Sequence, residues 1–220
     1  MRYDKHVWVV LLADHDQARA NDDLLTHRIA LARRVTHPDR ILVAVHGGWP
    51  WPIRNVSPEN VVLSPGDRGT APAALASFLL AWSCDPEAVV ALLTGSSPVA
   101  WTRRRPRLDA AMARASRERT TVFVLADASE PWIAATPGAL LLCYEQIWPG
   151  TSGRVAAAPA LPSRSPARWL ILQRMLPTAS LSDVLAVRPR GMEVLAAPQP
   201  DGPDVTPRLH AGHRGLTVAF

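Results

Sequence analysis

Five short apolar runs, each about the length of one β-strand, dominate the first 126 residues of the chain. They occupy residues 6–13, 40–45, 60–64, 88–93 and 121–126. Most of them lack alternation of polar and apolar side chains, which predicts strands that are buried on both faces of a sheet. Such strands need a layer of helices on each side. The sequence therefore predicts an α/β fold with a parallel or mixed sheet.

Helical segments separate these runs. The first helix is expected to begin at Asn21 or Asp22, whose side chains suit a helix N-terminus, and to end before Pro38. Two further helices are expected over residues 70–82 and 108–119. This alternation of strands with helices is typical of an α/β domain.

The pattern weakens beyond residue 126. Strands are expected over residues 139–144 and 192–197, short helices over 167–175 and 181–187, and a loop or linker rich in Pro, Ser, Ala and Gly over 151–166. For the domain organisation, we expect residues 1–150 to form the core. Residues 151–220 are expected to be a trimmed C-terminal portion that completes the same domain.

Size and composition exclude several classes of protein. The chain has 220 residues and a mass of 23.9 kDa, enough for one large domain or two small ones. With 48% hydrophobic and 20% charged residues, it has the balance of a globular protein rather than a disordered or fibrous one. No apolar stretch approaches the roughly 20 residues of a membrane span, and no signal peptide precedes the first strand. We therefore expect a cytoplasmic protein with no membrane partner.

Cysteine and lysine are both scarce. Cys84 and Cys143 form neither a disulfide framework nor the spacing of a zinc site, so both are expected to be reduced packing residues. The net charge is +5, from 24 basic and 19 acidic side chains, but Lys5 is the only lysine. Any reaction that requires a lysine must use Lys5 or proceed without one.

One stretch of the chain carries a family resemblance. Residues 58–73 read Pro-Glu-Asn-Val-Val-Leu-Ser-Pro-Gly-Asp-Arg-Gly-Thr-Ala-Pro-Ala. This stretch resembles the P-E-N-(apolar)₃-E-P-x-x-R-N-T-A-P-A motif of the sugar-phosphate nucleotidyltransferases, most closely the mannose-1-phosphate guanylyltransferases. Residues 85–93, 181–186 and 201–209 are similar to further motifs of that family. The resemblance implies a Rossmann-like three-layer α/β/α (GT-A-like) fold and attack of a sugar 1-phosphate on a nucleoside triphosphate. Magnesium, backbone N–H groups and cationic side chains stabilise the charge in such a reaction.

The positions that carry catalysis in this family are altered here. The family's glycine-rich phosphate loop corresponds to residues 12–19, where all three glycines are replaced and only Arg19 is retained. Ser96 stands where the family has its first magnesium aspartate, and Asp204 matches the second. The two lysines of the family's motifs have no counterpart. Together these losses argue for a lost reaction; in an active enzyme, Arg19 and Asp204 would remain, with magnesium as the cofactor.

The loop at residues 65–70 is the best-preserved part of the resemblance. Arg68 lies between Gly66 and Gly69, so the loop can bend closely around a ligand. Thr70 is expected to cap the helix that follows, whose first N–H groups are expected to be unpaired and to favour an anion. We therefore predict a nucleotide or phosphate site at Arg68, Gly69 and Thr70, to which Arg19 also contributes.

Four other features carry two interpretations each. For residues 14–16 (Asp-His-Asp) a solvated turn is favoured over a metal or acid–base site. For residues 210–213 (His-Ala-Gly-His) a frayed terminus is favoured over a metal pair.

The basic run at residues 103–107 is expected in a loop before a helix. For this run a solvated surface is favoured over contacts with the phosphates of nucleic acid or lipid. Trp49 and Trp51 form either a stacking or partner-binding platform or side chains packed under a loop.

Three functional hypotheses follow from these residues. The leading one is a degenerate nucleotidyltransferase that has lost catalysis, retains a nucleotide or sugar-phosphate ligand, and acts as a regulatory or structural partner of another protein. The alternative is an active, magnesium-dependent enzyme of the mannose-1-phosphate guanylyltransferase type. The third is a module that binds nucleic acid or a protein partner through the arginine run and the tryptophans, although nucleic acid is disfavoured.

Overall fold

The computed structural model describes residues 5–13, 22–46, 53–66, 68–94, 98–125, 131–158 and 166–195. Within these ranges seven strands form one sheet, in the order β3-β2-β1-β4-β6-β5-β7. The strands are β1 (Val7–Leu12), β2 (Ile41–His46), β3 (Val61–Ser64), β4 (Val89–Leu93), β5 (Val122–Leu125), β6 (Trp132–Ala135) and β7 (Met192–Leu195). Strand β6 runs antiparallel to β4 and β5, and the other strand pairs are parallel. The mixed, mostly parallel sheet that the sequence predicts is confirmed.

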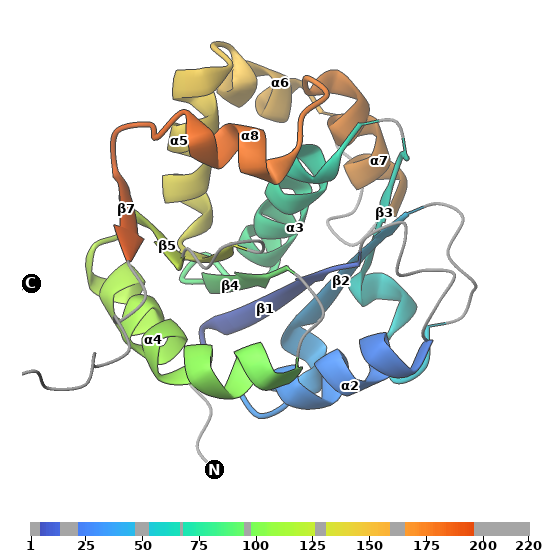
Figure 1. Ribbon diagram of the computed structural model, residues 1–220. Coiled ribbons are helices and arrows are strands. Elements are labelled where there is room, and N and C mark those ends of the chain that lie inside the picture. Colours follow the sequence, from blue (N-terminus) through green and yellow to red (C-terminus); the bar gives the residue numbers. More distant parts are fainter. Residues whose placement is uncertain are drawn as a thin grey trace, which may run out of the picture.

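Helices cover both faces of this sheet (Figure 1). One layer contains α3 (Thr70–Cys84), α5 (Pro137–Ile147), α6 (Thr151–Ala157), α7 (Pro166–Met175) and α8 (Leu181–Ala186). The opposite layer contains α2 (Asp22–Ala32) and α4 (Pro98–Arg117). Two short 3₁₀ helices, η1 (Pro38–Arg40) and η2 (Pro58–Asn60), lead into β2 and β3. The protein therefore has the three-layer α/β/α architecture.

Strand β1 shows why the apolar runs lack polar alternation. Its side chains alternate between the two faces, and all six residues are buried. Trp8 and Leu12 belong to the hydrophobic cluster under α3, whereas Val7 and Leu11 belong to the cluster under α2 and α4. Because both faces are covered by helices, an apolar residue is favoured at every position of the strand.

Helix α3 is the central helix of its layer. Every residue from Ala71 to Ala81 is buried, because the helix lies between the sheet and the helices α5, α7 and α8. Tyr144 of α5 is also fully buried, and its hydroxyl donates a 2.7 Å hydrogen bond to the carbonyl of Ala71. Although α3 is apolar all round, no helix in the described ranges is both long and apolar enough to cross a membrane.

Two predictions for the C-terminal half are wrong. Residues 139–144, predicted as a strand, lie inside α5. The side chain of Thr136 accepts a hydrogen bond from Ala139 N–H, and Pro137 fills the first turn, so this stretch begins with two helix-start signals. Part of the expected loop over residues 151–166 is likewise the helix α6, in which arginine and alanine supply helix propensity.

The preceding region also differs from the sequence analysis in two places. Helix α4 begins at Pro98 rather than at residue 108, because Trp101, Arg104 and Leu108 share one buried helical face. Pro106 is tolerated inside this helix on its exposed side, where water can bind the carbonyl that loses its partner. Strand β6, which the sequence analysis does not predict, pairs with both β4 and β5.

Candidate functional site

A small hollow lies at the carboxyl edge of the parallel strands, where ligands bind in open α/β sheets. It has a volume of about 90 Å³ and lies where β1, β2 and β3 end and α3 begins. Its lining consists of Leu12, Ala13, Ala44, Val45, Ser64, Pro65, Gly66, Gly69, Thr70 and Ala73. The predicted site residues Gly69 and Thr70 are therefore in its wall, and Arg68 lies between these two lining segments in the chain.

The loop before α3 is held by a segment more than a hundred residues later in the chain. We call residues 178–181 the crossing segment, because they pair with the start of α3. Ala179 N–H donates to the carbonyl of Arg68 at 3.1 Å, and Ala71 N–H donates to the carbonyl of Ala179 at 3.2 Å. Leu181 N–H donates to the Thr70 hydroxyl at 2.9 Å. These contacts fix the backbone of the loop at the rim of the hollow.

Gly69 permits this close approach. Its φ is +74°, and a Cβ at this position would lie 2.3 Å from the carbonyl oxygen of Ala179. Its ψ of −176° places it in a region of backbone conformation that is essentially restricted to glycine. The glycine that the sequence places beside Arg68 therefore serves the packing of the crossing segment.

Fewer backbone N–H groups are available to bind an anion at the start of α3 than the sequence predicts. Gly69 is the N-cap residue and supplies no side chain, and the Thr70 hydroxyl accepts from Leu181 rather than capping the helix. The N–H of Ala71 is already used by Ala179, and Pro72 has none. The expectation of a Thr70 cap with unpaired donors behind it is therefore wrong. Arg68 remains the main cation of the loop.

Arg68 is half-buried at the rim of the hollow. One guanidinium nitrogen lies 3.5 Å from the hydroxyl of Thr178, which is a long contact. The side chain therefore points toward the crossing segment and does not line the hollow. An anionic ligand at the rim can accept a strong, charge-assisted hydrogen bond from this weakly held guanidinium.

A second arginine lies at the same edge of the sheet. Arg28 of α2 is 7% exposed, and its two terminal nitrogens donate to the carbonyls of Leu12 at 3.0 Å and Leu93 at 2.8 Å. It therefore ties together the carboxyl ends of β1 and β4 and adds a buried positive charge there. Arg28 is not among the residues that the sequence predicts. The sequence does contain an indication of its burial, because Arg28 lies on the same helical face as the buried residues Leu25 and Ile29.

The other predicted site residues lie outside the described residues. They are Arg19, Ser96 and Asp204, together with residues 14–16, Trp49, Trp51 and residues 210–213. In the part of the chain that the structure describes, no group of His, Cys, Asp and Glu could hold a metal ion. Among the described residues, the lining of the hollow contains no carboxylate. Ser96 and Asp204, the positions that the resemblance assigns to magnesium, lie outside the described residues, so magnesium stays a prediction.

The basic run at residues 103–107 lies within α4, and most of its arginines serve the fold. The guanidinium of Arg104 lies 5.2 Å from the ring centre of Trp132. Arg105 pairs with Asp109 at 2.7 Å, and Arg107 donates to a carbonyl of β7 at 2.6 Å. These contacts support the structural interpretation of the run over nucleic-acid binding.

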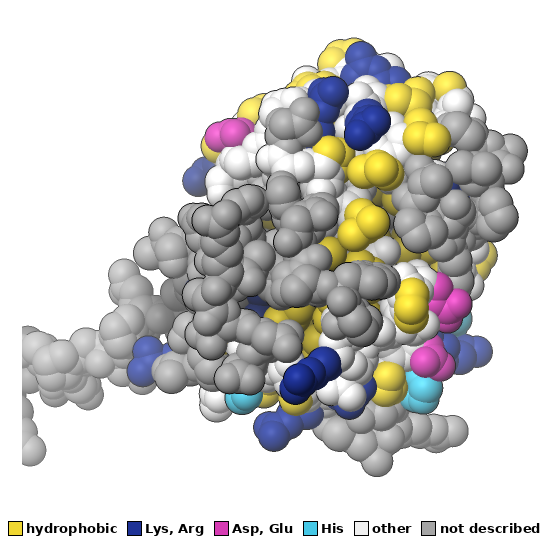
Figure 2. All heavy atoms as spheres, turned by 90° about the vertical axis from the view of Figure 1, so that its right-hand side faces the viewer, with side chains coloured by type: hydrophobic (Ala, Val, Ile, Leu, Met, Phe, Trp, Pro, Cys, Tyr) yellow, Lys and Arg dark blue, Asp and Glu magenta, His cyan; other side chains and the backbone are white. Residues whose placement is uncertain are grey.

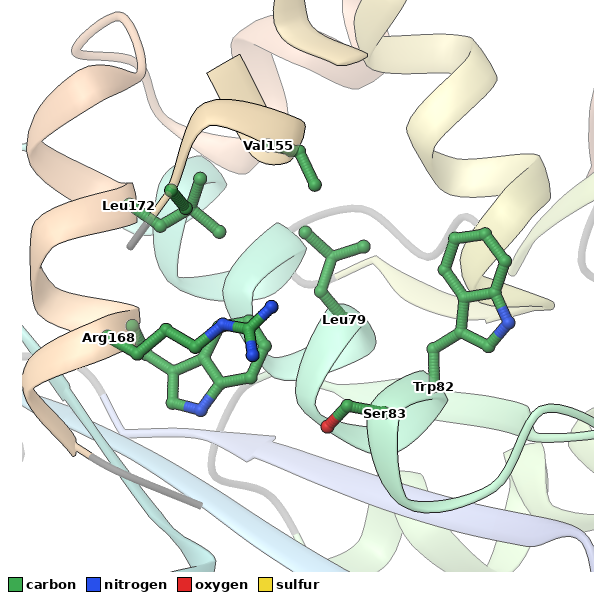
Figure 3. A pocket seen from close by; sticks show the side chains of 8 residues that line it. Leu79, Trp82, Ser83, Val155, Arg168 and Leu172 are labelled. Atoms are coloured by element: carbon green, nitrogen blue, oxygen red, sulfur yellow. The ribbon is translucent and has the colours of Figure 1, made fainter. Parts of the chain in front are cut away.

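An apolar hollow lies within the helical layer that contains α3, α6 and α7 (Figure 3). It has a volume of about 230 Å³ between α3, α6 and α7, and its walls include Leu79, Val155 and Leu172. In Figure 3, the side chain of Arg168 extends from α7 toward α3, and Trp82 lies on the side of the hollow away from α7. Hydrophobic side chains also gather on the face of the molecule seen in Figure 2. Most of its lining is apolar, and Ser83 and Arg168 contribute polar side chains.

Comparisons with known proteins identify the fold. No protein-family model matches the chain, and a search of curated proteins found no match. Among solved structures, a mannose-1-phosphate geranyltransferase from Thermus thermophilus matches with a TM-score of 0.61 and 14% identity, over 87% of this chain and 74% of that one. A mannose-6-phosphate isomerase from Helicobacter pylori matches with a TM-score of 0.58 and 11% identity, over 87% of this chain and 97% of that one. At these identities the likeness shows the fold alone, a mixed, mostly parallel sheet covered by helices.

Proposed function

We propose that this chain is a nucleotidyltransferase-like protein that binds a nucleotide or a sugar phosphate and does not catalyse nucleotidyl transfer. Binding would then serve a regulatory or structural role toward a protein partner. The observation that carries the proposal is the hollow where β1, β2 and β3 end beside the Arg68 loop. This is the edge at which open α/β sheets bind their ligands.

The charge at this edge favours an anion. Among the described residues, the side chains that line the hollow are all uncharged. Arg68 lies at the rim, and Arg28 adds a buried positive charge at the ends of β1 and β4. A volume of about 90 Å³ suits a phosphate group, with the rest of the ligand extending outward.

The loss of transfer is supported by several independent changes. The residues in place of the family's phosphate loop include Asp14 and Asp16, whose carboxylates would repel a triphosphate. Ser96 is a poorer magnesium ligand than a carboxylate. At the start of α3, the crossing segment uses an N–H donor that a phosphate would otherwise engage.

An active enzyme is the alternative. Residues 58–73 resemble the guanylyltransferase motif, and the fold matches that of a protein described as a mannose-1-phosphate geranyltransferase. In this case Arg19, Arg68 and Asp204 would carry the remaining site, with magnesium as the cofactor. The structure offers less support for nucleic-acid binding, because most arginines of the run in α4 are engaged within the protein.

A transfer assay separates the two candidates. The purified protein is incubated with GTP, mannose 1-phosphate and magnesium, and pyrophosphate release and GDP-mannose are measured. We expect no product above background. Magnesium-dependent turnover that disappears in Asp204→Ala would establish the active enzyme instead.

Binding is tested with a thermal-shift panel of nucleotides and sugar phosphates, because a ligand of the native state raises its apparent stability. For the best ligand, Arg68→Ala is expected to weaken binding roughly tenfold to a hundredfold, the effect of one charge-assisted contact. Asp14→Ala should leave binding unchanged or strengthen it. Arg103→Ala, an exposed arginine of α4, is the matched control. If Arg68→Ala binds as wild type while Asp14→Ala loses binding, the ligand site is at residues 14–16.

A further inference from the structure

The apolar hollow between α3, α6 and α7, which we call the helical-layer hollow, has the size of a single large side chain. Leu79, Trp169 and Leu172 of its lining are buried in the core, and Figure 3 shows Leu79, Val155 and Leu172 around one space. An apolar cavity of about 150 Å³ accommodates benzene, so the hollow's volume of about 230 Å³ admits one bulky apolar group. Pockets for whole small molecules are larger, about 300–1,000 Å³.

An exposed tryptophan lies beside this hollow. Trp82 belongs to its lining and is 40% exposed, although most of α3 is buried. Figure 3 shows its ring on the side of the hollow away from α7. Tryptophan is enriched among the residues that contribute most to protein–protein binding, and such residues pack with pockets at the centre of an interface. A hollow with an exposed indole at its side therefore has the character of an interface centre.

The charge of the three helices has one sign. Helix α3 contains no charged residue, and the charged residues of α6 and α7 are Arg154, Arg168 and Arg174. Among the described residues that line the helical-layer hollow, Arg168 is the charged one, and its guanidinium carbon lies 5.1 Å from the ring centre of Trp169. Positive charge beside an apolar hollow favours a partner that carries negative charge.

The acidic residues that adjoin these helices in the chain have partners elsewhere. Both oxygens of Asp85, which follows α3, lie 3.1 Å from Nδ1 of His6. Glu145 and Asp183 accept hydrogen bonds from backbone N–H groups at the starts of α6 and α8. Arg154 acts electrostatically on Glu145, so its charge is partly matched. No carboxylate of the described part of the chain lines the helical-layer hollow.

We propose that the helical-layer hollow docks an acidic segment of a protein partner, which inserts one large apolar side chain between the three helices and places a carboxylate near Arg168. A membrane fits less well, because a bilayer receives apolar side chains that protrude and cannot fill a hollow of this size. The proposal gives a surface to the proposed regulatory or structural role. It does not require nucleotide binding, since Thr70 and Trp82 lie roughly 18 Å apart along α3 at about 1.5 Å per residue.

A phage-displayed library of random peptides tests both the chemistry and the place of docking. Peptides are selected on the wild type, and those that also bind Ala158→Phe are removed, because the larger side chain of this variant fills the hollow. We expect the remaining peptides to be enriched in Asp and Glu around one Trp, Phe or Leu. The best of them is synthesised with a fluorescent label, and its affinity is measured by fluorescence anisotropy without nucleotide.

Variants separate the apolar and the charged contributions. Trp82→Ala is expected to raise the dissociation constant about tenfold, as for a central interface residue. Arg168→Gln should raise it several-fold and reduce the weakening of binding by added salt. Val194→Ala, an equally exposed apolar residue on β7, and Arg103→Ala, an exposed arginine of α4, are the matched controls and should bind as wild type. Circular dichroism and thermal melting verify that each variant is folded.

Two further measurements complete the test. Arg68→Ala should bind the peptide normally, so a failure of the proposed nucleotide site does not affect this result. Co-sedimentation with vesicles of phosphatidylglycerol should show no binding. Acidic peptides with an apolar anchor that lose affinity in Trp82→Ala support the proposal. It is overturned if no peptide distinguishes the wild type from Ala158→Phe, if the retained peptides carry no net negative charge, if Trp82→Ala binds as wild type, or if vesicles bind in a manner that depends on Trp82.

Discussion

The contact between Gly69 and the crossing segment allows a quantitative prediction for Gly69→Ala. The new Cβ would lie 2.3 Å from the carbonyl oxygen of Ala179, which is backbone and cannot rotate away as a side chain could. The segment must therefore move. Two hydrogen bonds would be lost or lengthened, from Ala179 N–H to Arg68 and from Ala71 N–H to Ala179.

The expected loss follows from these contributions. Holding alanine at the φ of +74° and ψ of −176° of Gly69 costs about 1–3 kcal/mol. Each hydrogen bond contributes about 1 kcal/mol. Gly69→Ala should thus lower the free energy of unfolding by about 3–5 kcal/mol, a large share of the 5–15 kcal/mol typical of a domain.

Two glycines provide matched controls. Gly150 also has a positive φ, +86°, but a Cβ there finds no atom within 4 Å, so Gly150→Ala should cost only about 1 kcal/mol of strain. Gly153 lies inside α6 with open space around it, and Gly153→Ala should stabilise by about 0.5–1 kcal/mol.

Urea unfolding followed by tryptophan fluorescence measures the stability of all three variants. Their transition midpoints are compared after checking that the unfolding free energy depends equally on urea concentration in each. Amide hydrogen exchange at Ala71 and Ala179 reports whether the crossing segment has separated from α3. The reasoning is refuted if Gly69→Ala is no less stable than Gly150→Ala, or if both amides keep their wild-type protection.

Three further predictions concern buried polar groups. Tyr144→Phe should lower the free energy of unfolding by about 1–2 kcal/mol, because it removes a buried hydrogen bond to the carbonyl of Ala71; urea unfolding measures it. Asp85→Asn should destabilise the protein at pH 7. Because folding lowers the pKa of Asp85 beside His6, this stabilisation is present above the unfolded pKa of about 4 and is lost as the pH falls through the folded value. The melting temperatures of wild type and variant should therefore converge below pH 4, and a constant difference down to pH 2 contradicts this. Burial raises the pKa of Cys143 to about 11, so iodoacetamide at pH 8 should label Cys84 first and Cys143 only after unfolding, as mass spectrometry can show.

The strands of the first half could be predicted because their signal is local. A run such as residues 88–93 is apolar at every position, as expected for a short strand that helices cover on both faces. Residues 139–144 were ambiguous for the same reason, since a short apolar run also suits a buried helix. The deciding residues were Thr136 and Pro137, which lie just before the run and start a helix.

The candidate site was predictable only in part. The sequence places Arg68 and Gly69 at the start of α3, but it does not show which distant segment packs there. Pairing between residues 68–71 and 178–181 joins positions about 110 apart, and no local pattern encodes such a contact. The same limit applies to the contact between His6 and Asp85. His6 and Asp85 are 79 residues apart and meet only because β1 lies beside β4.

The position of β7 has a consequence for how the chain folds during synthesis. Strand β5 is apolar throughout and pairs with β6 on one side, but its partner on the other side is β7, which ends 70 residues later. At about 5–20 residues per second, a ribosome needs roughly 4–14 seconds to add that stretch. During this interval the outer edge of β5 lacks its native neighbour, and an apolar edge of this kind readily pairs with other chains. Nascent chains that stall before residue 192 should therefore be the species most in need of a chaperone.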